Sequence, residues 1–348
     1  MSTGDSSGNW VTLLEGNERR GGTSSGRRSP PKDLVWKVAL SEAIRSSPLL
    51  RDGVLFVTCR DGCAHALDSR TGKQRWKFQA GAPIDSTPSI SGNLLFFGCD
   101  DGALYAVNLT SGLLEWRAEG DGAIWTTPIV RDDAVYAGSS DGTFKAVDRS
   151  TGRTRWKRHM EGRICSTAYA AASQIYFGCT DGHVYALDRA SGQDAWRYLT
   201  GEGVIASPAV VDGMVVVGSE DFYVYALDAG TGALRWKFET DLGIAASAAI
   251  ADGRVFIGGK DGYVYALSLT DGKELWKSKP LRTITASPMA GPSIVCIQTF
   301  YGSTQAYDAK TGEELWRANL GGSLQSTPIV TDELVYLATY PGVVYALR

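Results

Sequence analysis

Tryptophan recurs along most of this chain at an interval of 40 residues, and this period restricts the fold more than any other feature of the sequence. A Ser or Thr followed by Pro or Ala repeats in the same register, from Ser47-Pro48 to Thr327-Pro328. A period of about 40 residues with four short strand signals per unit is typical of β-propeller blades. We therefore predict an all-β fold, an eight-bladed β-propeller of four-stranded antiparallel blades. The repeated tryptophans are Trp36, Trp76, Trp116, Trp156, Trp196, Trp236, Trp276 and Trp316.

The first repeat indicates how one blade is built. Its strand signals are rich in β-branched and aromatic residues, as in the Val-Leu-Phe-Val run that begins at Val54. Asp-Gly or Thr-Gly pairs stand between these runs, and such pairs tolerate the positive φ that tight antiparallel connections require. We place the four strands near Arg45–Leu50, Val54–Cys59, Ala64–Asp68 and Gln74–Gln79.

The two ends of the repeat array are expected to complete one blade together. The last repeat stops at Arg348 after its third strand, and Trp36–Leu40 has the pattern of the missing fourth strand. We expect residues 33–348 to form a propeller that is closed by pairing of this N-terminal strand with the last blade. That blade would combine about 321–348 with 33–40. Because closure removes exposed sheet edges, we expect a monomer.

Residues 1–32 differ from the repeats. They are rich in Ser, Gly and Arg and contain no apolar run long enough for a signal peptide or a membrane span. This composition predicts a disordered tail, a cytoplasmic location and no membrane partner. The whole chain has 35 basic and 38 acidic residues and a net charge of -3, so it lacks the basic surplus that nucleic-acid binding exploits. We expect no nucleic-acid partner.

Cysteine and histidine form no recognisable motif. The six cysteines include no CxxC pair, and Cys59, Cys99 and Cys179 occupy the same position of three different repeats, which places them too far apart for a disulfide. His65 stands where most repeats have Tyr, so a structural role in a strand is the simpler interpretation. We expect free thiols, no metal site and no catalytic residues.

The segment from Ala66 to Trp76 resembles the A-x-D-x-x-T-G-x-x-x-W motif of pyrroloquinoline-quinone (PQQ) repeat proteins, and it recurs closely at Ala186–Trp196 and Ala226–Trp236. The resemblance extends over about residues 33–348. It implies a propeller in which each repeated Trp packs between neighbouring blades instead of stacking on a ligand. It also implies that the Asp and Thr-Gly of the motif stabilise a turn.

Proteins with such repeats include quinoprotein dehydrogenases, outer-membrane assembly scaffolds of the BamB type, and propeller modules attached to kinases or adenylating enzymes. The resemblance implies that a dehydrogenase would have long insertions and a disulfide between adjacent cysteines beside its cofactor. This sequence has no Cys-Cys dipeptide and no insertion between repeats. We therefore expect neither PQQ-dependent catalysis nor another cofactor.

Function is sought where the repeats differ from one another. In a propeller, the loop before the first strand of a blade and the turn between its second and third strands share the face that usually binds ligands. Both positions vary between the repeats of this chain, although variable loop residues can also simply face water. Aromatic and cationic side chains there suit a planar or anionic ligand. The predicted ligand-binding residues at the channel mouth are Arg45, Asp85, Trp125, Cys165, Thr285, Gln325, Arg60, Phe300, Tyr301 and Tyr340.

Three functions are compatible with this sequence. The leading hypothesis is a soluble, non-catalytic scaffold that recognises a protein, peptide or small-molecule ligand at the channel mouth. The alternative is an enzyme of specialised metabolism, a cyclase, lyase or hydrolase that uses Asp85, Arg45 and Trp125. A purely structural repeat array is the third. The substitution Asp85→Asn separates the first two, because a scaffold would change only its affinity whereas an enzyme would lose turnover while still binding substrate.

Overall fold

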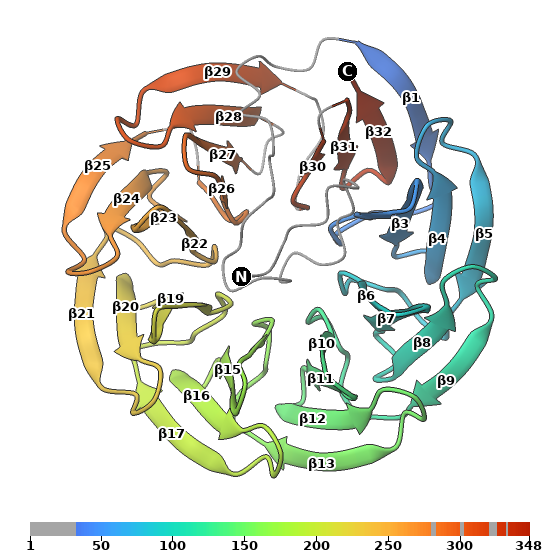
Figure 1. Ribbon diagram of the computed structural model, residues 1–348, viewed down its shortest axis with the longest axis horizontal. Coiled ribbons are helices and arrows are strands. Elements are labelled where there is room, and N and C mark those ends of the chain that lie inside the picture. Colours follow the sequence, from blue (N-terminus) through green and yellow to red (C-terminus); the bar gives the residue numbers. More distant parts are fainter. Residues whose placement is uncertain (1–32, 280–282, 300–302, 320–325, 332) are drawn as a thin grey trace. The chain divides into compact units, whose positions relative to one another are not determined.

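A computed structural model describes residues 33–348 except 280–282, 300–302, 320–325 and 332. Within these residues the chain forms eight antiparallel sheets of four strands each, which confirms the predicted eight-bladed β-propeller (Figure 1). Seven sheets consist of strands that follow one another in the sequence, and the eighth combines both ends of the described chain. No helix in the described part is long and apolar enough to cross a membrane. The predicted tail, residues 1–32, lies outside the described residues.

The blades divide between two compact units, and the first unit comprises the described residues of Pro31–His159 and Gln325–Arg348. It holds blades 1, 2, 3 and 8. Blade 1 consists of β2 (Leu49–Arg51), β3 (Val54–Thr58), β4 (Cys63–Asp68) and β5 (Gln74–Gln79); blade 2 of β6 (Ser89–Ser91), β7 (Leu94–Gly98), β8 (Leu104–Asn108) and β9 (Leu114–Ala118); blade 3 of β10 (Ile129–Arg131), β11 (Ala134–Gly138), β12 (Thr143–Asp148) and β13 (Thr154–His159); and blade 8 of β30 (Ile329–Val330), β31 (Val335–Ala338), β32 (Val343–Leu347) and β1 (Leu34–Ala39).

The second unit lies within Met160–Leu324 and holds blades 4 to 7. Blade 4 consists of β14 (Tyr169–Ala170), β15 (Gln174–Gly178), β16 (His183–Asp188) and β17 (Asp194–Leu199); blade 5 of β18 (Ala209–Val211), β19 (Met214–Gly218), β20 (Tyr223–Asp228) and β21 (Leu234–Glu239); blade 6 of β22 (Ala249–Ala251), β23 (Arg254–Gly258), β24 (Val264–Ser268) and β25 (Glu274–Ser278); and blade 7 of β26 (Met289–Ala290), β27 (Ile294–Gln298), β28 (Ser303–Asp308) and β29 (Glu314–Asn319).

The first strand of blade 1 is shorter than predicted, because β2 begins at Leu49 and not near Arg45. Pro48 has no N–H to donate to a sheet. The N–H of Ser47 instead donates to Thr87 Oγ1 in the next blade at 2.9 Å, and Ser46 Oγ donates to the carbonyl of Thr58 at 2.7 Å. These bonds draw the segment from Arg45 to Pro48 out of the strand and into a loop.

The repeated tryptophans join neighbouring blades. The Nε1–H of Trp76 in blade 1 donates to the carbonyl of Leu109 in blade 2 at 3.0 Å. A Cβ at Gly112 would lie 2.7 Å from the Trp76 ring, so only glycine leaves room for the indole there. The same bond to the next blade is made by Trp36, Trp116, Trp196, Trp236 and Trp276. This arrangement agrees with a packing role for the tryptophans.

The N-terminal strand closes blade 8 as predicted. Strand β1 pairs antiparallel with β32, and Trp36 lies opposite Ala346. Trp36 is 9% exposed and packs with residues of blades 8 and 1 in one apolar cluster that includes Ile44, Leu55 and Tyr336. The apolar core of the first unit therefore continues across the junction between the two ends of the chain.

Candidate ligand-binding site

The turn after β3 contacts the loops before the first strands of blades 1 and 2. The N–H of Arg60, in the turn after β3, donates to the carbonyl of Ala43 in the loop before β2 at 3.0 Å. The N–H of Ile84 donates to the carbonyl of Cys59 at 3.2 Å, so the loop before β6 rests on the turn of the preceding blade. Ile44 and Ile84 are fully buried and anchor these loops. As a result, the residue after each anchor faces the turn of the blade before it.

Asp85 binds two guanidinium groups at this junction. Its Oδ2 accepts from Arg60 Nη1 at 2.5 Å and from Arg45 Nη1 at 3.1 Å. The Asp85 side chain is only 10% exposed, whereas those of Arg45 and Arg60 are 41% and 30% exposed. The loop residues of blades 1 and 2 and the turn residue of blade 1 therefore form one charged group. Charge-assisted bonds of this kind hold the carboxylate in a fixed position.

The second oxygen of Asp85 is unpartnered. Asp85 Oδ1 is buried and has no hydrogen-bond partner among the described residues. A buried acceptor without a donor costs roughly 1–3 kcal/mol, so the site favours any group that brings an N–H or O–H to this oxygen.

Trp125 extends the group toward blade 3. Its Nε1–H donates to Asp100 Oδ1 at 2.9 Å, and the indole remains 36% exposed. Arg60 Nη1 lies 3.9 Å from Asp100 Oδ2 and links this pair to Asp85. Burial raises the pKa of Asp100, and the hydrogen bond from Trp125 opposes this shift.

Tyr340 completes the group on the side of blade 8. The guanidinium carbon of Arg45 lies 5.6 Å from the centre of the Tyr340 ring, within the range of a cation–π contact. The pKa of Arg45 is raised, first by its hydrogen bond with Tyr340 and further by the charge of Asp85. We call the set Arg45, Arg60, Asp85, Asp100, Trp125 and Tyr340 the Arg–Asp cluster.

The sequence missed Asp100, although a signal was available. Asp100 occupies in blade 2 the position that Arg60 occupies in blade 1 and Tyr340 in blade 8. Since the loops before β6 and β10 both rest on the turn of the preceding blade, the partner of Trp125 could have been identified from the repeat alone. The same turn position supplies an ion pair in the second unit, where Lys260 Nζ lies 2.5 Å from Glu220 Oε2.

The remaining predicted site residues do not belong to this cluster as the structure describes it. Cys165 and Thr285 lie in the second unit, where Cys165 is half-buried, Thr285 is exposed, and burial raises the pKa of the Cys165 thiol. Gln325, Phe300 and Tyr301 lie outside the described residues. Their part in ligand binding stays a prediction.

The chemistry of the Arg–Asp cluster suits recognition. It offers exposed guanidinium surface on Arg45, an unpartnered acceptor on Asp85 and a flat exposed face on Trp125. A bound group with a hydrogen-bond donor beside a planar part would match these three features. The potential nucleophiles of the cluster are the carboxylates of Asp85 and Asp100 and the hydroxyl of Tyr340.

Comparisons with known proteins agree with this fold. A family model described as "Outer membrane protein assembly factor BamB" matches residues 29–198 and 168–348. No curated protein matches the sequence. Among solved structures, BamB from Moraxella catarrhalis is 20% identical with a TM-score of 0.80, over 91% of this chain and 99% of that chain. The computationally designed Ika8 protein is also 20% identical, with a TM-score of 0.81 over 91% and 100% of the two chains. A europium-containing methanol dehydrogenase is 13% identical, with a TM-score of 0.82 over 94% and 89%.

Proposed function

Since this chain belongs to the family of the outer membrane protein assembly factor BamB, we propose that it is a non-catalytic binding scaffold whose Arg–Asp cluster recognises its ligand. The ligand would be a protein segment, peptide or small molecule that presents a hydrogen-bond donor to Asp85 Oδ1 and a planar group to Trp125. The solved structures with this fold include both an assembly factor and a dehydrogenase. At 13–20% identity they support the fold alone, so the proposal depends on the cluster.

One observation carries the proposal: Arg45 and Arg60 bind the same oxygen of Asp85. A general base must present a free lone pair to the proton that it removes. Oδ2 of Asp85 already accepts from two cations, so this oxygen is held in place and only Oδ1 keeps a free lone pair. Fixed charges beside an exposed aromatic ring are typical of recognition surfaces.

Affinity capture with matched variants tests the proposal. Wild-type protein, Trp125→Ala and Leu113→Ala are immobilised and exposed to fractionated peptides and small molecules, and the retained molecules are identified by mass spectrometry. Leu113 is the control because it is 69% exposed and lies outside the cluster. We expect a ligand retained by wild type and Leu113→Ala but lost by Trp125→Ala. Identical retention by all three proteins would refute the proposal.

The enzyme alternative is favoured by one feature, the unpartnered Oδ1 of Asp85. This oxygen could accept a proton from a bound substrate. Asp85→Asn keeps the shape of the side chain but removes its charge. If wild type converted the captured ligand, and Asp85→Asn still bound the ligand but no longer converted it, the protein would be an enzyme and not a scaffold.

A further inference from the structure

We propose that blade 1 contains a zinc-binding site formed by Cys59, Asp61 and His65. Cys59 directly follows β3, Asp61 lies in the turn and His65 lies in β4, so one hairpin supplies all three residues. One potential ligand atom from each residue lies within 4.8 Å of the others. Thiolate, carboxylate and imidazole together are a ligand set that Zn²⁺ favours, and three protein ligands leave a fourth position for water.

The polar partners of His65 suit a bound cation. Its Nε2 lies 3.0 Å from Asp61 Oδ2, and its Nδ1 lies 3.3 Å from Gln74 Oε1. Both partners are acceptors, whereas a neutral imidazole has one proton to donate. If Gln74 accepts that proton, Nε2 keeps a lone pair that faces the Asp61 carboxylate. A metal ion between them would satisfy both atoms, with Gln74 holding the ring as outer partners of metal-bound histidines do.

Cys59 supplies the third ligand on the buried side. It is fully buried, and its Sγ lies 3.2 Å from the carbonyl oxygen of Glu42. The side chains of His65 and Asp61 are 5% and 11% exposed, so Asp61 provides the edge through which an ion would enter. Ligand atoms around tetrahedral zinc are about 3.3–3.8 Å apart, and side-chain rotations of modest size would bring the group to that spacing.

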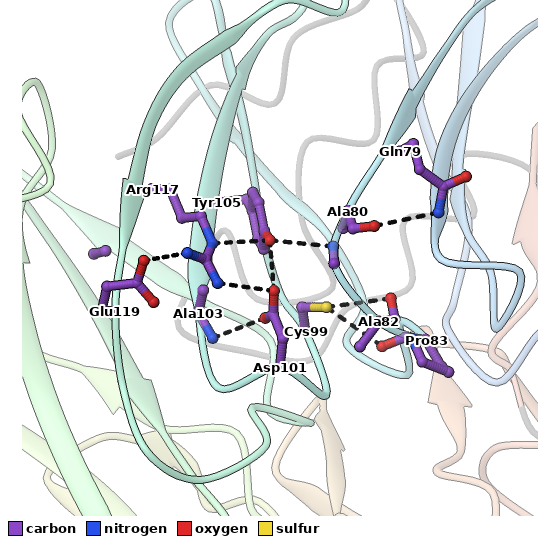
Figure 2. A network of polar contacts seen from close by, with 12 residues as sticks. Gln79, Ala80, Ala82, Pro83, Cys99, Asp101, Ala103, Tyr105, Arg117 and Glu119 are labelled. Atoms are coloured by element: carbon purple, nitrogen blue, oxygen red, sulfur yellow. Dashed lines mark hydrogen bonds and ion pairs between the residues drawn. The ribbon is translucent and has the colours of Figure 1, made fainter.

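The other blades provide internal controls, because among the described residues only blade 1 brings Cys, Asp and His ligand atoms within 4.8 Å of one another. In blade 2, Tyr105 replaces the histidine and donates its hydroxyl to Asp101 Oδ2 at 2.6 Å, close to Cys99 (Figure 2). Tyr185 and Tyr225 make the same bond in blades 4 and 5. Tyrosine therefore fills this position as a structural residue, and the histidine of blade 1 changes that arrangement by adding an imidazole beside Cys and Asp.

The variants follow from this comparison. His65→Tyr gives blade 1 the residue found in blades 2, 4 and 5, and Cys59→Ser gives it the residue found at the same position as Ser139 and Ser219. Both substitutions remove a ligand while keeping a side chain that this fold already accommodates. Cys99→Ser is the matched control, because it removes the equivalent thiol of blade 2.

Metal binding is measured on the full chain after chelator treatment. Zn²⁺ is titrated by calorimetry, and Co²⁺ is used as a spectroscopic probe for thiolate ligation. We expect one equivalent of Zn²⁺, a thiolate-to-cobalt charge-transfer band, and binding at least about tenfold weaker in His65→Tyr. The charge-transfer band should disappear in Cys59→Ser and persist in Cys99→Ser. Circular dichroism melting confirms that each variant is folded.

Three results would overturn the proposal. The first is the absence of stoichiometric Zn²⁺ binding to the wild-type chain. The second is equal affinity of wild type and His65→Tyr, which would place the ion elsewhere. The third is a charge-transfer band that survives in Cys59→Ser. If His65→Tyr failed to fold, the cobalt spectrum of Cys59→Ser would still decide the question.

Discussion

Lys145 is a buried cation in a position where this fold normally has tyrosine. It lies in β12 and is 6% exposed, and its Nζ donates to the carbonyl of Glu119 at 3.1 Å. The equivalent residues Tyr105 and Tyr185 bind the Asp of their own turn instead. Burial lowers the pKa of Lys145 from 10.5 to about 8. We predict that Lys145→Met, which keeps the stem and removes the charge, stabilises the protein near neutral pH.

The magnitude follows from the pKa difference between the folded and unfolded states. A shift from 10.5 to about 8 corresponds to roughly 3 kcal/mol of destabilisation by the charged form, at about 1.4 kcal/mol per pKa unit. Loss of the bond to Glu119 offsets about 1 kcal/mol, so the expected net gain at pH 7 is about 2 kcal/mol.

The pH dependence of stability shows whether the charge of Lys145 destabilises the folded protein. Below about pH 8 Lys145 is charged in both states, and the cost of its burial is fully present. Between about pH 8 and 10.5 the unfolded chain binds more protons at this residue than the folded chain, so wild-type stability rises with pH relative to the variant. The advantage of Lys145→Met should therefore be largest near pH 7 and shrink toward pH 10. Urea denaturation of both proteins at pH 7, 8.5 and 10 measures it, and an advantage that is absent at pH 7 or grows with pH would refute the reasoning.

Four other substitutions test the packing and turn chemistry. Gly112→Ala should destabilise the protein by about 3 kcal/mol or more, because its Cβ would lie 2.7 Å from Trp76 at a φ of +71°. Gly213→Ala should cost only about 1–2 kcal/mol, because Gly213 has a φ of +73° and no atom lies within 4 Å of the added Cβ. Equal urea midpoints for the two variants would contradict the packing role of the tryptophan. Phe222→Gly should raise the melting temperature, because the φ of +77° strains a non-glycine backbone and the ring is 46% exposed. An unchanged or lower melting temperature would show that contacts of the ring stabilise the protein by more than this strain destabilises it. Arg75 and Thr71 lower the pKa of Asp68 to about 2, so the stabilisation from Asp68 is present above about pH 4 and lost toward pH 2. The difference in melting temperature between wild type and Asp68→Ala should therefore shrink over that range. A constant difference would exclude the charge of Asp68 as its cause.

The sequence predicts the fold well because each repeat contains its own packing rule. Trp76 and Gly112 are 36 residues apart, and the same spacing brings Gly152 to Trp116 and Gly232 to Trp196. The start of the first strand could not be predicted in the same way. Ser47 has a donor that binds Thr87 in the next blade, and this long-range bond overrides the local β pattern.

The candidate site was predictable only in part. Variation between repeats selected Arg45, Asp85 and Trp125, and the structure places them in one connected group. Asp100 was missed because the contact runs from one blade to the turn of the blade before it, which the order of residues does not display directly. Their role in ligand binding stays a prediction.

The Cys59, Asp61 and His65 grouping was also missed, for a different reason. Its members alternate along one hairpin and match no familiar zinc spacing. Their proximity depends on how the turn after β3 folds and on which way each side chain points, and neither can be read from spacing alone.

The most direct test of the central claim is the affinity of the captured ligand for wild type, Trp125→Ala and Leu113→Ala, measured by calorimetry. A recognition site centred on the Arg–Asp cluster predicts that Trp125→Ala weakens binding by about 2 kcal/mol or more, roughly thirtyfold, while Leu113→Ala binds like wild type. Equal affinity of all three proteins would contradict the assignment of ligand recognition to this cluster.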